Sequence, residues 1–169
     1  MRRRIFDNEG HAFFVTFSCY RRRRLLDDNQ AKGIVIHFLS EQLKNQQGSC
    51  VGFVVMPEHV HALIHFNENG QLSIFMNQWK RRSSMQLKKL YRNDLSAYGR
   101  QIDLEGPMWQ PKYYAFNVYS EKKAKEKLDY MHNNPVKAGL VENAVDWPHS
   151  SARWYFLGKS VGVAINETI

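Results

Sequence analysis

Two histidines separated by one apolar residue are the part of this chain best suited to chemistry. They are His59 and His61, in the segment 56–61 that reads MPEHVH. Strand-like residues lie on both sides, and alternate side chains of a strand share one face. The two imidazoles would therefore project together while Val60 points into the core. Such a pair supplies half of a metal site or binds a phosphate. The alternative is a pair of ordinary core or surface histidines.

A second candidate lies on a predicted helix near residue 130. Tyr130 and Asn134 are i and i+4, so their side chains are neighbours on the helix surface. Both lie away from the apolar stripe of that helix, and lysines flank them. A phenol beside an amide is an unusual face for packing alone. The spacing by itself leaves two interpretations open, a catalytic tyrosine or an amphipathic surface residue.

Positive charge is in excess and is clustered along the chain. The 169 residues carry a formal net charge of +8, which favours a polyanionic partner, and aromatic residues among the charges favour nucleic acid. The alternative is a solvated basic surface. Candidates to contact phosphates are Arg21, Arg22, Arg23, Arg24, Lys80, Arg81, Arg82, Lys88, Lys123 and Lys127, and a further cluster is Arg2–Arg4. Candidates to stack on bases are Tyr113, Tyr114 and Phe116.

Cysteine content and hydropathy restrict the class of protein. Cys19 and Cys50 lack a CxxC partner, so neither a zinc ribbon nor a disulfide framework is indicated. No apolar run reaches the length of about 18 residues that a membrane span needs. We therefore expect a cytoplasmic, nucleoid-associated protein with no membrane partner.

The periodicity of apolar residues predicts the elements that must position these side chains. Strands are predicted over 11–20, 50–55 and 59–66, helices over 27–46, 73–91 and 121–133, and extended chain at the end of 108–119. Ser73 and Ser120 would cap the second and third helices. The third helix would end before Pro135, because a residue that precedes proline disfavours helical backbone. We predict a loop over 93–107.

The order of these elements predicts the fold class. It is that of an α+β protein with a ferredoxin-like antiparallel sheet and helices packed on one face. We expect residues 1–169 to form a single domain, with an irregular C-terminal extension from about residue 136.

Several motifs, taken in chain order, resemble the single-tyrosine HUH transposases, and among them the REP-associated tyrosine transposases. They are PEHVH at 57–61, Trp109-Gln110, YMHNNPVKAGLV at 130–141, Trp147-Pro148 and Ser150-Ser151. The resemblance extends from about Phe13 to Tyr155 and so covers most of the chain.

The resemblance implies a fold, a reaction and a role for each matched residue. The implied fold is the ferredoxin-like HUH domain. His59 and His61 match histidines that bind Mg²⁺ or Mn²⁺, and Asn134 matches the amide that completes this metal site. Tyr130 matches the nucleophile, whose attack on phosphorus would give a 5′-phosphotyrosine and a free 3′-OH. The implied enzyme cleaves and rejoins single-stranded DNA at palindromic hairpin repeats, without a nucleotide cofactor, as a monomer or a homodimer.

Activation of the nucleophile is left open by the sequence. A phenol has a pKa of about 10 in water, so Tyr130 needs help to lose its proton. The metal and either Lys123 or Lys127 would favour the phenolate. Glu126, on the same side of the helix, would oppose it unless it acts as a base or is itself paired.

Two positions depart from the family pattern. The family usually has an acidic residue where this chain has Ala115, and often an arginine where it has Tyr119. Neither position is a metal ligand or the nucleophile, so we expect the chemistry to survive with altered substrate positioning. Tyr113-Tyr114 offers a rival nucleophile, but only Tyr130 has an amide at i+4.

Two alternative functions remain beside the transposase. One is a hairpin DNA-binding module with weak or lost cleavage, which the net charge and Ala115 would suit. The other is a two-histidine phosphodiesterase acting on RNA or nucleotide esters, but its usual second motif is matched only by His149-Ser150-Ser151, which lacks the spacing. His65 shares the parity of the paired histidines and is a candidate outer-shell residue.

Overall fold

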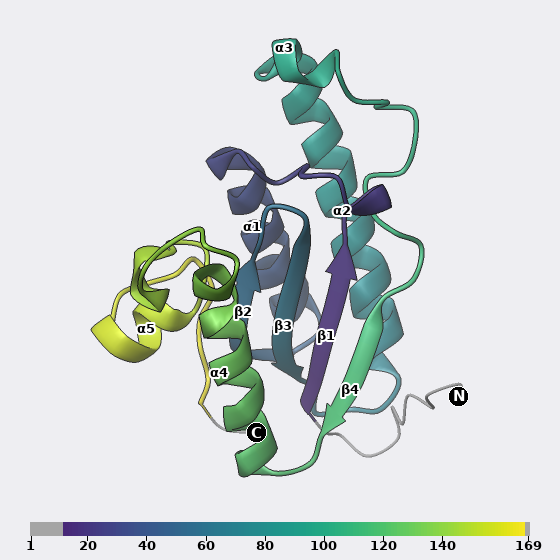
Figure 1. Cartoon of the computed structure of the whole chain (residues 1–169). Coiled ribbons are helices and arrows are strands. Elements are labelled where there is room, and N and C mark those ends of the chain that lie inside the picture. Colours follow the sequence, from purple (N-terminus) through teal and green to yellow (C-terminus); the bar gives the residue numbers. More distant parts are fainter. Residues whose placement is uncertain (1–11, 168–169) are drawn as a thin grey trace.

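An antiparallel sheet of four strands forms the centre of the structure (Figure 1). The strands are β1 (Ala12–Ser18), β2 (Ser49–Val55), β3 (His59–His65) and β4 (Tyr114–Val118). Their spatial order is β2-β3-β1-β4, so β3 and β1 are the central strands. The order and the alternation of strands and helices confirm the predicted α+β fold.

The structure is a computed structural model that describes residues 12–167. The predicted basic cluster Arg2–Arg4 lies outside this range. Within the described residues, no helix combines the length and hydrophobicity that crossing a membrane requires.

The sheet is apolar on both faces, which explains its nearly continuous hydrophobic strands. In β1 the residues Phe13, Val15 and Phe17 belong to one apolar cluster, whereas Ala12 and Phe14 belong to another. Successive side chains of a strand point to opposite faces, so the two clusters lie on opposite sides of the sheet. Both faces therefore need helices to cover them.

Two long helices cover the first face. α1 (Asn29–Asn45) begins after Asp28, whose carboxylate accepts a hydrogen bond from the Gln30 amide at 2.7 Å. α2 (Gln71–Asn93) packs beside it, and the indole of Trp79 donates to the Val35 carbonyl at 2.9 Å. This bond fixes α2 against α1 within the core.

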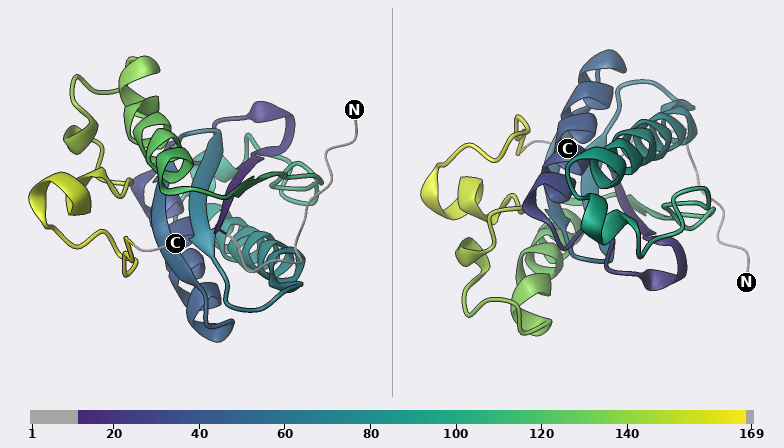
Figure 2. Two further views of the ribbon diagram at one scale, coloured as in Figure 1. Left: turned by 90° about the horizontal axis from the view of Figure 1, so that it is seen from below. Right: turned by 90° about the horizontal axis from the view of Figure 1, so that it is seen from above.

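The third long helix lies on the opposite face. α4 (Glu121–Lys137) buries Ala124 and Met131 in the cluster that contains Phe14 and Leu63. Figure 2 shows α4 on one side of the sheet and α1 and α2 on the other. The prediction that the helices share one face therefore holds for α1 and α2 and is wrong for α4, because the alternate apolar residues of β1 and β3 leave a second face to be covered.

α4 also continues past the residue at which we expected it to end. Pro135 lies inside the helix and is buried. Its ring removes the amide that would donate to the carbonyl four residues earlier, and burial of the ring helps to offset this loss. The helix then closes with Gly139 at a φ of 71°, and the Leu140 amide donates to the Pro135 carbonyl at 3.0 Å. This is a Schellman cap, which requires the left-handed residue that glycine supplies.

One other boundary and three short helical segments differ from the prediction. α2 begins two residues before Ser73, after Gly70 at a φ of 80°, so Ser73 is not its N-cap. The expected loop over 93–107 contains a short helix α3 (Ser96–Gly99). Two short helical segments also replace part of the irregular C-terminal extension, namely η2 (Ala144–Asp146) and α5 (Ala152–Leu157). A further 3-10 turn, η1 (Tyr20–Arg22), follows β1.

The C-terminal extension packs along the outer edge of β2. Ser150 forms a bridge with Val54, the indole of Trp147 donates to the Val55 carbonyl at 3.0 Å, and the Asn166 amide donates to the Cys50 carbonyl at 2.8 Å. These bonds cover an edge that would otherwise expose its backbone groups.

Gly52 is the position in β2 on which α4 rests, and it gives a test of this contact. An added Cβ would lie 2.3 Å from Leu128 Cδ2 and 3.0 Å from Ser151 Oγ. We expect Gly52→Ala to lower the free energy of unfolding by about 1–3 kcal/mol, because it overpacks this interface. Urea denaturation followed by circular dichroism measures the change.

Gly33→Ala is the matched control. Gly33 is exposed on α1, and a Cβ there meets nothing within 4 Å. The substitution should raise the free energy of unfolding by about 0.5–1 kcal/mol, since alanine loses less entropy in a helix. Equal effects of the two substitutions would contradict the proposed contact of α4 with Gly52.

Candidate functional site

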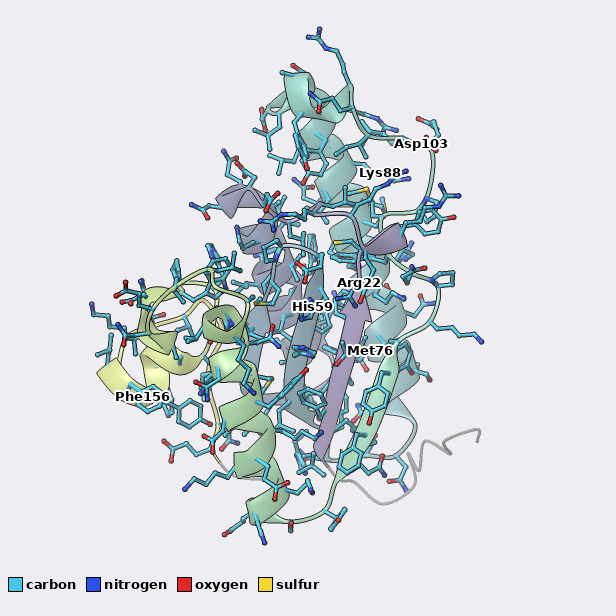
Figure 3. The ribbon with its side chains drawn as sticks, in the orientation of Figure 1. Arg22, His59, Met76, Lys88, Asp103 and Phe156 are labelled. Carbon is cyan, nitrogen blue, oxygen red and sulfur yellow. The ribbon has the colours of Figure 1, made fainter. Side chains whose placement is uncertain are left out.

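A cavity of about 450 Å³ opens on the sheet face that α4 covers, beside the central strands. Its lining residues come from β1, η1, β3, β4 and α4. They are Phe14, Thr16, Arg22, His59, His61, Tyr114, Lys127, Tyr130 and Asn134. Figure 3 shows Arg22 and His59 at the same end of the sheet. All four residues that the sequence singled out for chemistry lie in this one cavity.

β3 holds the two histidines side by side. His59 and His61 lie opposite Ser18 and Thr16 in the pairing with β1. Their ring centroids are 4.6 Å apart, and both side chains are buried. Because β3 is hydrogen-bonded on both sides, the separation of the two rings is fixed by the sheet. Val60 lies between them and faces the opposite core, as the sequence predicts.

Each histidine has a hydrogen-bond partner at Nδ1. His59 Nδ1 lies 2.8 Å from Glu58 Oε1, and His61 Nδ1 lies 2.7 Å from Thr16 Oγ1. A carboxylate only accepts, so the first bond puts a proton on Nδ1 and leaves a lone pair on Nε2 of His59. His61 Nε2 is buried and has no hydrogen-bond partner among the described residues. A buried nitrogen of this kind is costly unless something binds to it.

Tyr130 and Asn134 approach the histidines from α4. The Tyr130 ring lies edge-on to His61 with centroids 5.4 Å apart, and it also contacts the Phe14 ring at 6.1 Å. The Asn134 side chain lies beside His59 in the same cavity. The tyrosine side chain is 44% exposed, so its hydroxyl is open to a substrate.

His132 anchors the helix that carries Tyr130. It is buried on the opposite side of α4, and its Nε2 lies 2.8 Å from Ser151 Oγ. The Ser151 hydroxyl in turn accepts from the Phe53 amide at 3.0 Å. Ser151 therefore joins α4 to β2, and this link holds the tyrosine at a fixed height above the sheet.

Burial and positive neighbours keep the paired imidazoles neutral. Burial lowers the pKa of His61 to about 3, and the charges of His59, Lys127 and Arg22 act in the same direction. Burial also lowers the pKa of His59, although Glu58 opposes this shift. Neutral imidazoles keep a lone pair for a metal ion, whereas protonated ones do not.

The donor set of the cavity suits a small divalent ion. No group of three His, Cys, Asp or Glu side chains gathers anywhere in residues 12–167. A metal here would therefore be held by two imidazoles and one amide oxygen, and its other positions would be open to substrate oxygens. Such a set has fewer protein ligands than the closed four-ligand site of a structural zinc ion, so it would leave positions for a substrate.

Two of the basic residues predicted to contact nucleic acid line this cavity. Lys127 Nζ lies 4.7 Å from the Phe14 ring centroid and 4.8 Å from that of Phe116. Arg22 follows Arg21 in a turn where both have a φ of 55°, an unfavourable backbone conformation for such side chains. This turn brings Arg22 to the rim, within 3.9 Å of Glu58.

The other predicted basic residues lie elsewhere. Three of them form ion pairs: Arg24 with Asp27 at 2.7 Å, Lys123 with Glu126 at 2.5 Å, and Arg82 with Glu41 at 4.0 Å. Lys80 and Arg81 line a second cavity. Arg21 lies over the Tyr20 ring, Arg23 is exposed, and Lys88 lies farther along α2 (Figure 3). Lys123 is therefore engaged by Glu126, and only Lys127 of the two candidate lysines borders the cavity.

Sequence reasoning missed three residues of the site. Glu58 and Thr16 orient the histidines, and Phe14 lies against the ring of His61 with centroids 5.3 Å apart. Glu58 directly precedes His59, and Thr16 is the polar residue in an aromatic run. Both positions can be seen in the sequence. The pairing of Thr16 with His61, however, depends on the register of β1 and β3.

The structure also places the other residues that the sequence singled out, and most of them lie outside the cavity of His59 and His61. Ala115 is buried in the cluster beneath α2, so this departure from the family pattern faces away from the histidines. Tyr119 is 71% exposed beyond β4. His65 lies at the far end of β3 opposite Ala12, and neither it nor His149 lines the cavity. Tyr114 does line the cavity and remains a rival to Tyr130.

Comparisons with known proteins find similarity over most of the chain. The model of the family described as "Transposase IS200 like" matches residues 8–134. A REP-associated tyrosine transposase of Escherichia coli K12 is 26% identical over 143 residues, which are 85% of this chain and 77% of that protein. A solved REP-associated tyrosine transposase bound to a REP hairpin superposes with a TM-score of 0.72 at 22% identity, over 100% of this chain and 94% of that one. The last likeness confirms the fold.

The buried histidines give a prediction for the metal-free protein. Burial lowers the pKa of His61 to about 3 and the pKa values of His132 and His149 to about 4. In the unfolded chain these residues take up protons at about pH 6.5. The unfolded state then binds more protons than the folded one, so the free energy of unfolding should fall as the pH decreases from about 6.5 towards about 4.

Two measurements check this expectation. NMR titration in EDTA should show no movement of the ring proton signals of His61, His132 and His149 between about pH 7.5 and about pH 5.5. Urea denaturation over the same range should show stability decreasing on acidification. Titration of these signals with midpoints near the ordinary histidine value would contradict the buried, neutral site.

Proposed function

The chain belongs to the IS200-like transposase family, and from this premise we propose that it cleaves and rejoins single-stranded DNA with Tyr130 as the nucleophile. The observation that carries the proposal is the meeting of two elements in one cavity. α4 brings Tyr130 and Asn134 to the face of β3 that carries His59 and His61. A phenol placed beside neutral imidazoles and basic side chains suits attack on a phosphodiester.

We propose that His59, His61 and Asn134 hold Mg²⁺ or Mn²⁺. Three features support this assignment: the buried His61 Nε2 without a partner, the Nδ1 bonds that orient both rings, and the Asn134 side chain beside His59. Such an ion, when bound, polarises the scissile phosphate and neutralises charge on its oxygens.

The residues of the chain have distinct parts in the proposed reaction. The Tyr130 oxygen forms a bond to phosphorus as the bond from phosphorus to the 3′ oxygen breaks. The phenol loses its proton, the leaving oxygen gains one as the free 3′-OH, and a 5′-phosphotyrosine results. Arg22 and Lys127, at the rim of the cavity, are suited to hold the nonbridging phosphate oxygens. Attack by a 3′-OH reverses the step and rejoins the strand, so no nucleotide cofactor is needed.

We propose hairpin DNA as the substrate. The net charge of +8 and the rim residues Arg22 and Lys127 support a polyanionic partner, and a protein of the same fold has been solved with a REP hairpin. Binding to such repeats would place the protein at the nucleoid. Tyr130 and His61 of the same chain are in contact, so a monomer can complete the site.

A denaturing gel tests the nucleophile directly. Purified protein is incubated with labelled single-stranded DNA carrying the palindromic repeat that flanks its own gene, with Mn²⁺ or Mg²⁺. We expect a protein–DNA adduct that survives denaturation, and Tyr130→Phe should abolish it, because the phenol oxygen forms the covalent bond. EDTA should abolish it as well.

Tyr114→Phe is the matched control, since Tyr114 lines the same cavity. This variant should still form the adduct. Loss of the adduct in Tyr114→Phe and its persistence in Tyr130→Phe would assign the nucleophile to the rival tyrosine. A hairpin-specific gel shift without adduct or cleavage in the wild type would favour the binding module instead.

The Thr16 hydroxyl gives a separate test of the metal site. Thr16→Val keeps the shape of the side chain but removes the partner of His61 Nδ1. We expect the affinity for Mn²⁺ to fall by about 10–100-fold, as it does when an outer-shell partner of a metal-bound histidine is lost. Isothermal titration calorimetry of the DNA-free protein measures this affinity. Thr16→Ser keeps the hydroxyl and should bind nearly as the wild type, and unchanged affinity in Thr16→Val would contradict the role of Thr16.

A further inference from the structure

A second cavity of about 430 Å³ lies on the other side of the sheet, between α2 and the segment 107–113. Basic, aromatic and hydrogen-bonding side chains line it together. They are Ser73, Met76, Asn77, Lys80, Arg81, Ser84, Pro107, Met108, Trp109, Gln110, Pro111 and Tyr113. Figure 3 labels Met76 on α2, beside β4. The mechanism proposed for Tyr130 uses none of these residues.

The tandem tyrosines connect this cavity to the candidate active site. Tyr113 lines the second cavity, and Tyr114, the next residue, lines the cavity of His59 and His61. Successive residues of extended chain point to opposite faces. β4 is also the last strand of the sheet. A flexible strand of DNA can therefore pass from one cavity to the other around this edge.

The wall of the second cavity is fixed by hydrogen bonds. Lys80 Nζ donates to the Gln110 carbonyl at 2.7 Å and to the Pro111 carbonyl at 3.1 Å. The Trp109 indole donates to the Lys80 carbonyl at 3.0 Å and to Ser83 Oγ at 3.2 Å. These bonds hold the segment 107–113 against α2, so little ordering is required when a ligand binds.

We propose that this second cavity binds an unpaired nucleotide of the DNA strand that is cleaved at Tyr130. The inference rests on the proposed function, because it takes its ligand from the same strand. Tyr113 offers surface to a base, Asn77 and Ser73 offer polar atoms to its edge, and Arg81 at the rim offers a positive charge to its phosphate. Aromatic surface combined with positive charge is the usual means of holding single-stranded nucleic acid.

Two adjacent arginines allow a matched test. Arg81 lines the cavity, whereas Arg82 is directed to Glu41 of α1, 4.0 Å away. Arg81→Gln and Arg82→Gln each remove one positive charge from α2, so their nonspecific effects on DNA binding should be alike. The dissociation constant is measured by fluorescence anisotropy with the hairpin repeat and its single-stranded flanks, in EDTA. We expect Arg81→Gln to raise Kd about tenfold, as the loss of one charged hydrogen bond does, and Arg82→Gln to raise it less than about twofold.

Trimming the DNA identifies the part of the strand that is bound. The same measurements are repeated with the hairpin stem and loop alone. The wild type should lose affinity on trimming, and Arg81→Gln should then bind like Arg82→Gln, because the nucleotide that Arg81 contacts is gone. If Arg81→Gln still raises the Kd for the trimmed hairpin more than Arg82→Gln does, the cavity does not bind a flanking nucleotide and the inference is overturned.

Photocrosslinking provides a direct readout. 5-Iodouracil is placed in turn at each flanking position, and crosslinked peptides are identified by mass spectrometry. A crosslink from one flanking position to the segment 107–113 supports the inference, and crosslinks from the flanks to other segments only would overturn it. The wild-type adduct at Tyr130 is assayed on the same DNA. An adduct together with equal effects of the two arginine substitutions would reject the second cavity alone, whereas absence of the adduct would reject the proposed function.

Discussion

The contact of α4 with β2 is the constraint on which the rest of the site depends. The histidines are fixed locally by β3, but Tyr130 and Asn134 reach them only because the helix rests on the sheet at Gly52. Any side chain at that position would meet Leu128 and Ser151. The bond between His132 and Ser151 adds a polar anchor at the same interface. The distance between Tyr130 and the imidazoles is therefore a property of packing between helix and sheet, which tolerates little change.

Polar side chains next to the paired histidines orient the imidazole rings. Glu58 and Thr16 occupy the Nδ1 atoms of the paired histidines, so the opposite nitrogens face the cavity. Burial keeps both rings neutral, and the cations Arg22 and Lys127 reinforce this for His61. The same two cations border the space that a phosphate would occupy. The charges that help to keep His61 neutral would therefore also attract a polyanion.

The distribution of basic residues shows that net charge is a coarse guide to a binding surface. Arg24, Lys123 and Arg82 pair with carboxylates and line neither cavity although they belong to basic clusters, whereas Arg22 lies near Glu58 and still lines the first cavity. Lys80 uses its ammonium group to hold a loop. Among the predicted basic residues, Arg22 and Lys127 line the first cavity, and Lys80 and Arg81 line the second. A turn or a helix face brings each of them to its cavity, and the net charge of the chain does not predict this placement.

The sequence by itself determined the strands, the long helices and the pairing of His59 with His61, because local alternation and helical period fix which side chains share a face. It also placed Tyr130 and Asn134 on one helix surface. Only the tertiary structure decided that α4 lies opposite α1 and α2, that it continues through Pro135, and that Thr16 meets His61. These features depend on strand register and on packing between distant segments. Such contacts outweigh local preferences such as the one before proline, since they bury apolar surface that no single segment can bury alone.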